Sequence, residues 1–78
     1  MPTNTARARP IFEVNELCYV AIDSWAGRST HQVQIEALNE LRARVRWLGG
    51  PVFNKLPGKV YDVPVLALRK RSIEEANG

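Results

Sequence analysis

The sequence has little with which to build a covalent or metal-stabilised core. Its 78 residues include one cysteine and one histidine. A single cysteine excludes an internal disulfide, and a zinc finger or ribbon needs four nitrogen or sulfur ligands. No apolar run approaches the roughly 20 residues of a transmembrane helix, and no signal peptide opens the chain. We therefore expect a small cytoplasmic domain without metal, cofactor or membrane partner.

The composition is that of a folded chain, with 45% hydrophobic and 24% charged residues. The length allows one domain. Chains below roughly 70–80 residues seldom bury enough core to be very stable alone, so we also expect a homo-oligomer. We assign a flexible basic arm to 1–10, one domain to 11–71 and a frayed tail to 72–78, because only the middle segment has apolar periodicity.

Charge is unevenly placed along the chain. Residues 1–41 contain three arginines and five acidic residues, whereas residues 42–78 contain eight basic and three acidic residues, a net charge of +5. An excess of this size attracts polyanions or acidic proteins, although it is also compatible with a solvated surface.

Two segments have clear strand signals. Residues 17–25 and 60–68 are rich in β-branched and aromatic types, as is typical of short strands. The first segment ends in a polar loop that contains Gly27, and Pro57-Gly58 precedes the second. Between them, Pro57-Gly58 fits the central positions of a type II turn.

The segment 31–48 admits two interpretations. A central helix at about 30–48, which would make the fold α+β, is favoured by its helix formers and by the Gly-Gly-Pro that follows. A pair of strands is favoured by long period-two alternation. The predicted buried set is Val33, Ile35, Ala37, Leu41, Ala43, Val45 and Trp47.

We favour the strands, because a loop at 38–40 gives a consistent hairpin register. It pairs Val33 with Val45 and Ile35 with Ala43, so that paired residues share a face. Asn39 tolerates the left-handed backbone conformation that such loops often need. The fold class predicted is all-β: a small antiparallel barrel of four to five strands.

The segments RARVRWLGG, LPGK and VYDVPVLALRKR resemble those of SH3-like and Tudor-like barrels, over roughly residues 16–71. In those families the penultimate strand breaks into a short 3₁₀ turn before the last strand. The resemblance implies that Val65-Leu66-Ala67-Leu68 forms this turn.

The C-terminal segment is also similar to that of the plasmid-borne type II dihydrofolate reductases, which are small SH3-like chains that act as tetramers. The similarity lies in Pro57-Gly58, Val60, Pro64-Val65 and Ala67-Leu68. Their ligand-binding segment is Val-Gln-Ile-Tyr, whereas this chain has Val60-Tyr61-Asp62-Val63. Their site is therefore not transferred to this chain.

Arginines at alternate positions are the main functional feature. In a strand, Arg42, Arg44 and Arg46 project from one face about 6–7 Å apart, a spacing similar to that of successive phosphates along one nucleic-acid strand. In a helix, Arg44 would point away from the other two. The predicted nucleic-acid contacts are Arg42, Arg44, Arg46, Lys55, Lys59, Arg69, Lys70 and Arg71.

Trp25 has two open interpretations. It either plugs one end of the barrel or is exposed. An exposed Trp25 could stack on a nucleic-acid base or, with Arg28, contact a protein partner. Cys18 is expected in the core and His31 at a loop edge, and no phosphate-binding loop or carboxylate pair stands out, so no enzyme is expected.

The function predicted is therefore a non-catalytic binding protein that contacts DNA or RNA through a basic face. The alternative is a protein-interaction module, or a homo-oligomeric adaptor of a mobile-element or accessory gene, with an acidic protein as a possible class of partner.

Overall fold

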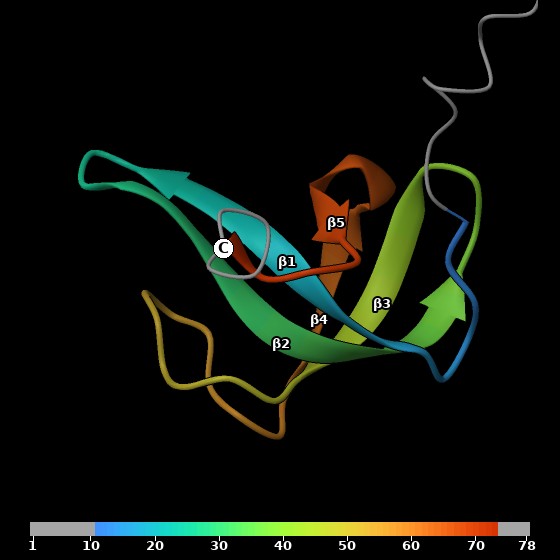
Figure 1. Ribbon diagram of the computed structural model, residues 1–78. Coiled ribbons are helices and arrows are strands. Elements are labelled where there is room, and N and C mark those ends of the chain that lie inside the picture. The colour runs from blue at the N-terminus through green and yellow to red at the C-terminus, as the bar shows by residue number, and fades with distance from the viewer. Residues whose placement is uncertain (1–10, 74–78) are drawn as a thin grey trace, which may run out of the picture.

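Five antiparallel strands form one sheet in the order β4-β3-β2-β1-β5 (Figure 1). The strands and a 3₁₀ turn are β1 (Leu17–Ser24), β2 (Gly27–Leu38), β3 (Arg42–Trp47), β4 (Val60–Pro64), η2 (Val65–Ala67) and β5 (Leu68–Arg69). This computed structural model describes residues 11–73. The arm predicted at 1–10 and most of the tail predicted at 72–78 lie outside the described residues.

The all-β prediction is confirmed, and the alternative of a central helix is wrong. The segment proposed for that helix lies in β2 and β3, which pair with each other over residues 33–38 and 43–47. The 3₁₀ turn expected between the last two strands is present at Val65–Ala67. The arrangement is consistent with a small β-barrel-like fold. Within residues 11–73, no helix is long and apolar enough to cross a membrane.

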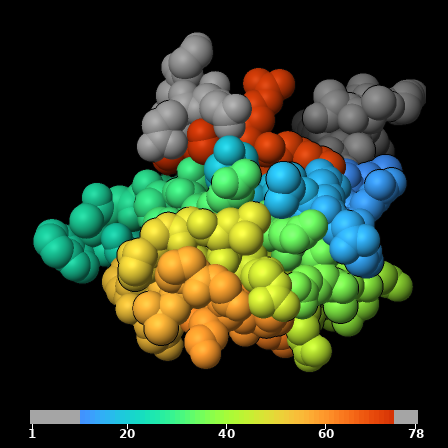
Figure 2. Space-filling model, turned by 90° about the horizontal axis from the view of Figure 1, so that it is seen from below, coloured from blue at the N-terminus to red at the C-terminus, as the bar shows by residue number. Residues whose placement is uncertain are grey.

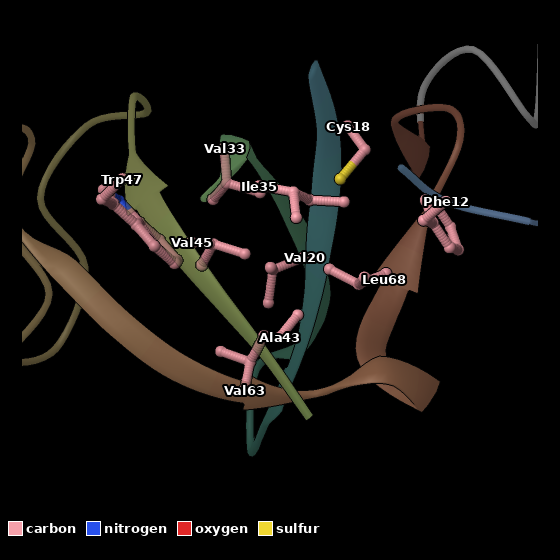
Figure 3. Close-up of a cluster of buried hydrophobic side chains, with 10 residues drawn as sticks. All are labelled: Phe12, Cys18, Val20, Val33, Ile35, Ala43, Val45, Trp47, Val63 and Leu68. Carbon is pink, nitrogen blue, oxygen red and sulfur yellow. The ribbon is translucent and has the colours of Figure 1, made fainter. Parts of the chain in front are cut away.

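The core lies on the inner face of the curved sheet (Figure 3). Trp47 lies at one end of the buried cluster and Phe12 at the other, with smaller aliphatic side chains between them. The buried residues are Phe12, Cys18, Val20, Val33, Ile35, Ala43, Val45, Trp47, Val63 and Leu68. Because these side chains come from all five strands and the segment before β1, the core joins the whole sheet.

Burial alternates along β2 and β3 as predicted, with two exceptions. The predicted residues that are buried are Val33, Ile35, Ala43, Val45 and Trp47. The prediction is wrong for Ala37 and Leu41, which are exposed. Leu38, which broke the period-two pattern, is half-buried and packs against the core.

A β-bulge at Glu36 explains the exposure of Ala37. On one side of the bulge Ile35 lies opposite Val45, and on the other side Ala37 lies opposite Arg44. One extra residue in β2 reverses the alternation of side chains, so Ala37 turns outward and the next residue turns inward.

The hairpin register predicted for β2 and β3 is wrong by two residues. Val33 pairs with Trp47 instead of Val45. Asn39 acts through its side chain and not through a positive φ: its Oδ1 accepts hydrogen bonds from the backbone N–H groups two and three positions later, at 2.9 and 2.8 Å. Leu41 consequently belongs to an exposed turn and not to a strand.

The connection from β3 to β4 contains the predicted turn at Pro57-Gly58. The φ of Gly58 is 86°, as the third residue of a type II turn requires, and the N–H of Lys59 donates to the carbonyl of Leu56 at 3.3 Å. A second tight turn is closed by two backbone hydrogen bonds between Val52 and Lys55, of 3.0 and 2.8 Å.

Truncating a core residue of β2 should strongly destabilise the fold. Ile35 is 0% exposed, so we expect Ile35→Ala to lower the free energy of unfolding by about 2–5 kcal/mol through lost burial and an unfilled cavity. Urea unfolding followed by circular dichroism measures this change. As a control, Leu41→Ala removes a side chain that is 75% exposed and should change stability by less than about 0.5 kcal/mol. Equal losses in the two variants would contradict the core described here.

Candidate nucleic-acid interface

The three alternating arginines of β3 lie on the outer face of the sheet. Ala43 and Val45, between them, are buried. Arg46 lies opposite Gln34 of β2, and Arg44 lies opposite Asp62 of β4. The strand geometry therefore places the guanidinium groups on one face, as the sequence predicted.

Two of these arginines are engaged by carboxylates. The Nε of Arg46 lies 2.5 Å from Oε2 of Glu36, and its Nη1 donates to the carbonyl of Gly58 at 2.8 Å. The Nη2 of Arg42 lies 3.7 Å from Oδ2 of Asp62 and 3.4 Å from the carbonyl oxygen of the same residue. These neighbours reduce the positive charge that the face presents to an anion.

Arg44 has no ion pair with any of residues 11–73. It lines a shallow, open pocket of about 330 Å³ together with Arg42, Asp62 and the end of β2. Ala37, turned outward by the bulge, is the residue directly opposite Arg44. Because alanine is small, it leaves room beside the Arg44 side chain for a ligand oxygen.

A second group of arginines gathers at the other end of the outer face. Arg28 of β2, Arg69 of β5 and Arg71 line one pocket of about 160 Å³, whose remaining wall includes Thr30. The backbone N–H of Ile73 donates to Oγ1 of Thr30 at 2.9 Å and so holds the segment after β5 against β2.

Arg69 is fixed by nearby backbone carbonyls and Arg28 by an ion pair. Nη1 of Arg69 donates to the carbonyls of Leu66 and Leu68, at 2.6 and 2.9 Å. Nε of Arg28 lies 2.8 Å from Oδ1 of Asp23, and this hydrogen bond lowers the pKa of the Asp23 carboxyl. Within the described chain Arg69 and Arg71 form no ion pair.

Strand register places the two groups on the same face. Gln34 lies opposite Arg46, and Gln32, two residues earlier on β2, lies opposite Tyr19. Tyr19 in turn lies opposite Arg69. Since residues paired across strands share a face, the outer side of the sheet carries both arginine groups, separated by the polar residues of β2.

The sequence did not predict this second group as a unit. The sequence predicted that Arg28 contacts a protein partner and that residues 69–71 extend the arginine face of β3. The pairing of β1 with β5, which brings Arg28 and Arg69 together, joins residues far apart in the chain. No local pattern reports such a pairing.

None of the three predicted lysines lines either of the two arginine pockets. Nζ of Lys70 is 2.5 Å from Oε2 of Glu16 and 4.5 Å from the centre of the Phe12 ring. The Lys70 hydrogen bond lowers the pKa of the Glu16 carboxyl. Nζ of Lys55 lies 5.1 Å from the centre of the Tyr61 ring, on the inner side of β4. Lys59 is exposed in the β3–β4 connection.

Trp25 is not a plug for the barrel. Its side chain is 98% exposed, in the turn between β1 and β2. The end of the barrel is instead filled by Trp47, whose Nε1 donates to the carbonyl of Gly50 at 3.0 Å. Trp25 is therefore available as a contact, as the other interpretation required.

Cys18 and His31 each have a structural role: Cys18 lies in the core and His31 stacks on Trp47. Cys18 is 1% exposed, and burial raises the pKa of its thiol to about 11. His31 stacks on Trp47 with ring centres 5.3 Å apart, and its Nε2 lies 2.8 Å from Oγ of Ser29. Burial lowers the pKa of His31. Residues 11–73 contain no group of three potential metal ligands.

Comparison with known proteins found no relative of this chain. No protein-family model, no curated protein and no solved structure matches the chain significantly.

The raised pKa of the Cys18 thiol predicts that this thiol reacts slowly in the folded protein. At pH 8 a rise from 9.0 to about 11 lowers the thiolate fraction roughly 100-fold. We therefore expect Cys18 to react with a disulfide reagent at least about 100-fold more slowly in the native protein than in urea. Adding Leu41→Cys supplies an exposed thiol that should react fast in the same molecule. Rapid modification of Cys18 in the folded protein would contradict its placement in the core.

Proposed function

We propose that this chain is a non-catalytic nucleic-acid-binding protein that contacts the phosphate backbone with the outer face of its sheet. The supporting observation is the balance of charge on that face. Its arginines are Arg28, Arg42, Arg44, Arg46 and Arg69. Its ion-paired carboxylates are Asp23, Glu36 and Asp62, which leave a positive excess.

The arginines that have no carboxylate partner among the described residues are the primary contacts in this proposal. Arg44 and Arg69, with Arg71 beside Arg69, present guanidinium groups that bind phosphate through paired hydrogen bonds. Arg42 and Arg46 contribute secondarily, because exposed ion pairs are worth little and a phosphate competes with their carboxylates. Lys55, Lys59 and Lys70 are left out of the interface.

This surface favours recognition of the backbone over recognition of bases. Polar side chains of β2, including Gln32 and Gln34, lie between the two arginine groups and offer hydrogen bonds to sugar and phosphate oxygens. We therefore expect weak sequence preference and a strong dependence on salt. The strand order and the 3₁₀ turn also support placing the chain in the SH3-like group.

A second candidate function is a protein-interaction module or homo-oligomeric adaptor. The observation that favours it is the almost complete exposure of Trp25 at the tip of a hairpin. Large aromatic side chains are among the residues that contribute most to protein–protein affinity.

A single substitution tests the nucleic-acid proposal. Arg44→Gln should weaken binding to both DNA and RNA oligonucleotides several-fold at low salt, because it removes one phosphate contact. It should also reduce the slope of log K against log salt by roughly 0.7–0.9. Fluorescence anisotropy at several salt concentrations measures both quantities.

Lys55→Gln is the matched control, since it removes the same charge from the inner side of the sheet. It should leave the slope unchanged and alter affinity less than about twofold. If the wild-type chain does not bind either nucleic acid at low salt, the proposal is wrong. Equal effects of the two substitutions would show attraction to net charge alone and would contradict the assigned face.

A further inference from the structure

The hairpin of β1 and β2 presents Trp25 away from the body of the protein. Figures 1 and 2 show this hairpin projecting beyond the rest of the molecule. Its turn is braced: Oγ of Ser24 donates to the carbonyl of Gly27 at 3.1 Å and accepts from the N–H of Ala26 at 3.2 Å. Gly27 has a φ of 116°, which favours glycine. The exposed Trp25 side chain is therefore held out on an ordered turn.

Trp25 lies close to the second arginine group. Arg28 follows it by three residues, so their Cα atoms are at most about 11 Å apart, and Arg28 lines one pocket with Arg69 and Arg71. The pKa of the Asp23 carboxyl, which pairs with Arg28, is lowered by that hydrogen bond and further by the charge of Arg69. Positive charge therefore gathers where the hairpin meets β5.

The pocket of this arginine group is too small for a whole nucleotide. Its volume is about 160 Å³, below the range of roughly 300–1,000 Å³ for pockets that enclose a small ligand. It suits a phosphate group, and the base attached to that phosphate has to lie outside it. Among residues 11–73 the exposed aromatic side chains are those of Trp25 and Phe53, and Phe53 lies in the β3–β4 connection. Trp25 is therefore the ring available to such a base.

The surroundings of Trp25 suit a nucleic-acid base better than a protein surface. Its exposed neighbours are charged or small: Asp23, Ala26, Gly27 and Arg28. Along residues 18–40, no other large hydrophobic side chain is exposed. The aromatic residues that contribute most to protein–protein affinity lie inside a ring of contacts that excludes water, and this hairpin has no apolar residues to form one. A base needs only the open face of the indole ring.

We propose that this end of the protein selects single-stranded nucleic acid, with Trp25 stacking on a base and the second arginine group contacting the phosphates beside it. The inference rests on the proposed nucleic-acid function and adds the class of nucleic acid. In a duplex, neighbouring bases cover both faces of each internal base, so the indole ring has no face to stack on. In a single strand these faces are free, and every base offers one. The contact is therefore compatible with weak sequence preference.

Trp25→Ala tests the stacking contact. It should weaken binding to a single-stranded oligonucleotide about 5- to 140-fold, because the stacking of one base is lost. Affinity for a duplex of the same composition, long enough that its ends contribute little, should change less than about twofold. Because Trp25 carries no charge, the slope of log K against log salt should stay the same. Fluorescence anisotropy of labelled nucleic acid measures each quantity.

Phe53→Asn is the matched control for Trp25→Ala. It removes an exposed aromatic ring that lines a groove with Val63, a residue of the inner face. Asn tolerates the positive φ of this position, which is 51°. The affinity of this variant for single strands should stay within about twofold of the wild type.

Tryptophan fluorescence reports on the stacking itself. The chain has two tryptophans, and Trp47 is 0% exposed, so quenching by an added single strand should come from Trp25. Trp25→Phe keeps a smaller ring and should bind single strands more tightly than Trp25→Ala, without this quenching. Arg71→Gln should reduce the salt slope on single strands by roughly 0.7 and leave the quenching at saturation unchanged.

The inference and the proposed function fail in different ways. If Trp25→Ala binds single strands as tightly as the wild type, the inference is wrong and Trp25 is left to a protein partner, whereas the effect of Arg44→Gln still supports the phosphate contacts. Equal losses on single strand and duplex, or an unquenched wild-type chain at saturation, would also overturn the inference alone. A wild-type chain that binds neither nucleic acid would overturn both.

Discussion

The pairing of β2 with β3 is the interaction on which the other features of this protein depend. It brings Val33 opposite Trp47 and Ile35 opposite Val45, and all four side chains are buried. Burial of these apolar side chains is the main favourable term that a small chain without disulfides can use. Because side chains alternate across a strand, the same pairing turns the arginines of β3 outward. Core and candidate interface are thus two consequences of one register.

The bulge at Glu36 adjusts this register where the strands leave the core. It lets Leu38 pack inward, places the small side chain of Ala37 opposite Arg44, and leaves Glu36 beside Arg46. One inserted residue therefore affects both the packing of the hairpin end and the charge of the outer face. A proposed phosphate contact at Arg44 depends on this detail, since its neighbours Arg42 and Arg46 are already paired with carboxylates.

The two proposals use different parts of one hairpin. The outer side of β2 carries polar residues that connect the arginine groups. The turn at the end of the hairpin carries an exposed tryptophan that suits the face of a base.

Much of the fold was determined by local pattern in the sequence. Period-two alternation predicted the strands and most of the buried set, because a strand can bury only one of its two faces. The Pro57-Gly58 turn was also correctly predicted, since the conformations of proline and glycine restrict the backbone there. The 3₁₀ turn at Val65–Ala67 was expected only from the resemblance to SH3-like barrels. The same alternation placed Arg42, Arg44 and Arg46 on one face.

Only the tertiary structure decided the register of β2 against β3, the bulge at Glu36, the proximity of Arg28 to Arg69, and the exposure of Trp25. Each of these depends on which strands become neighbours and on how the core is filled, with Trp47 and Phe12 at its ends. Such contacts join residues far apart in the chain, so no local pattern encodes them.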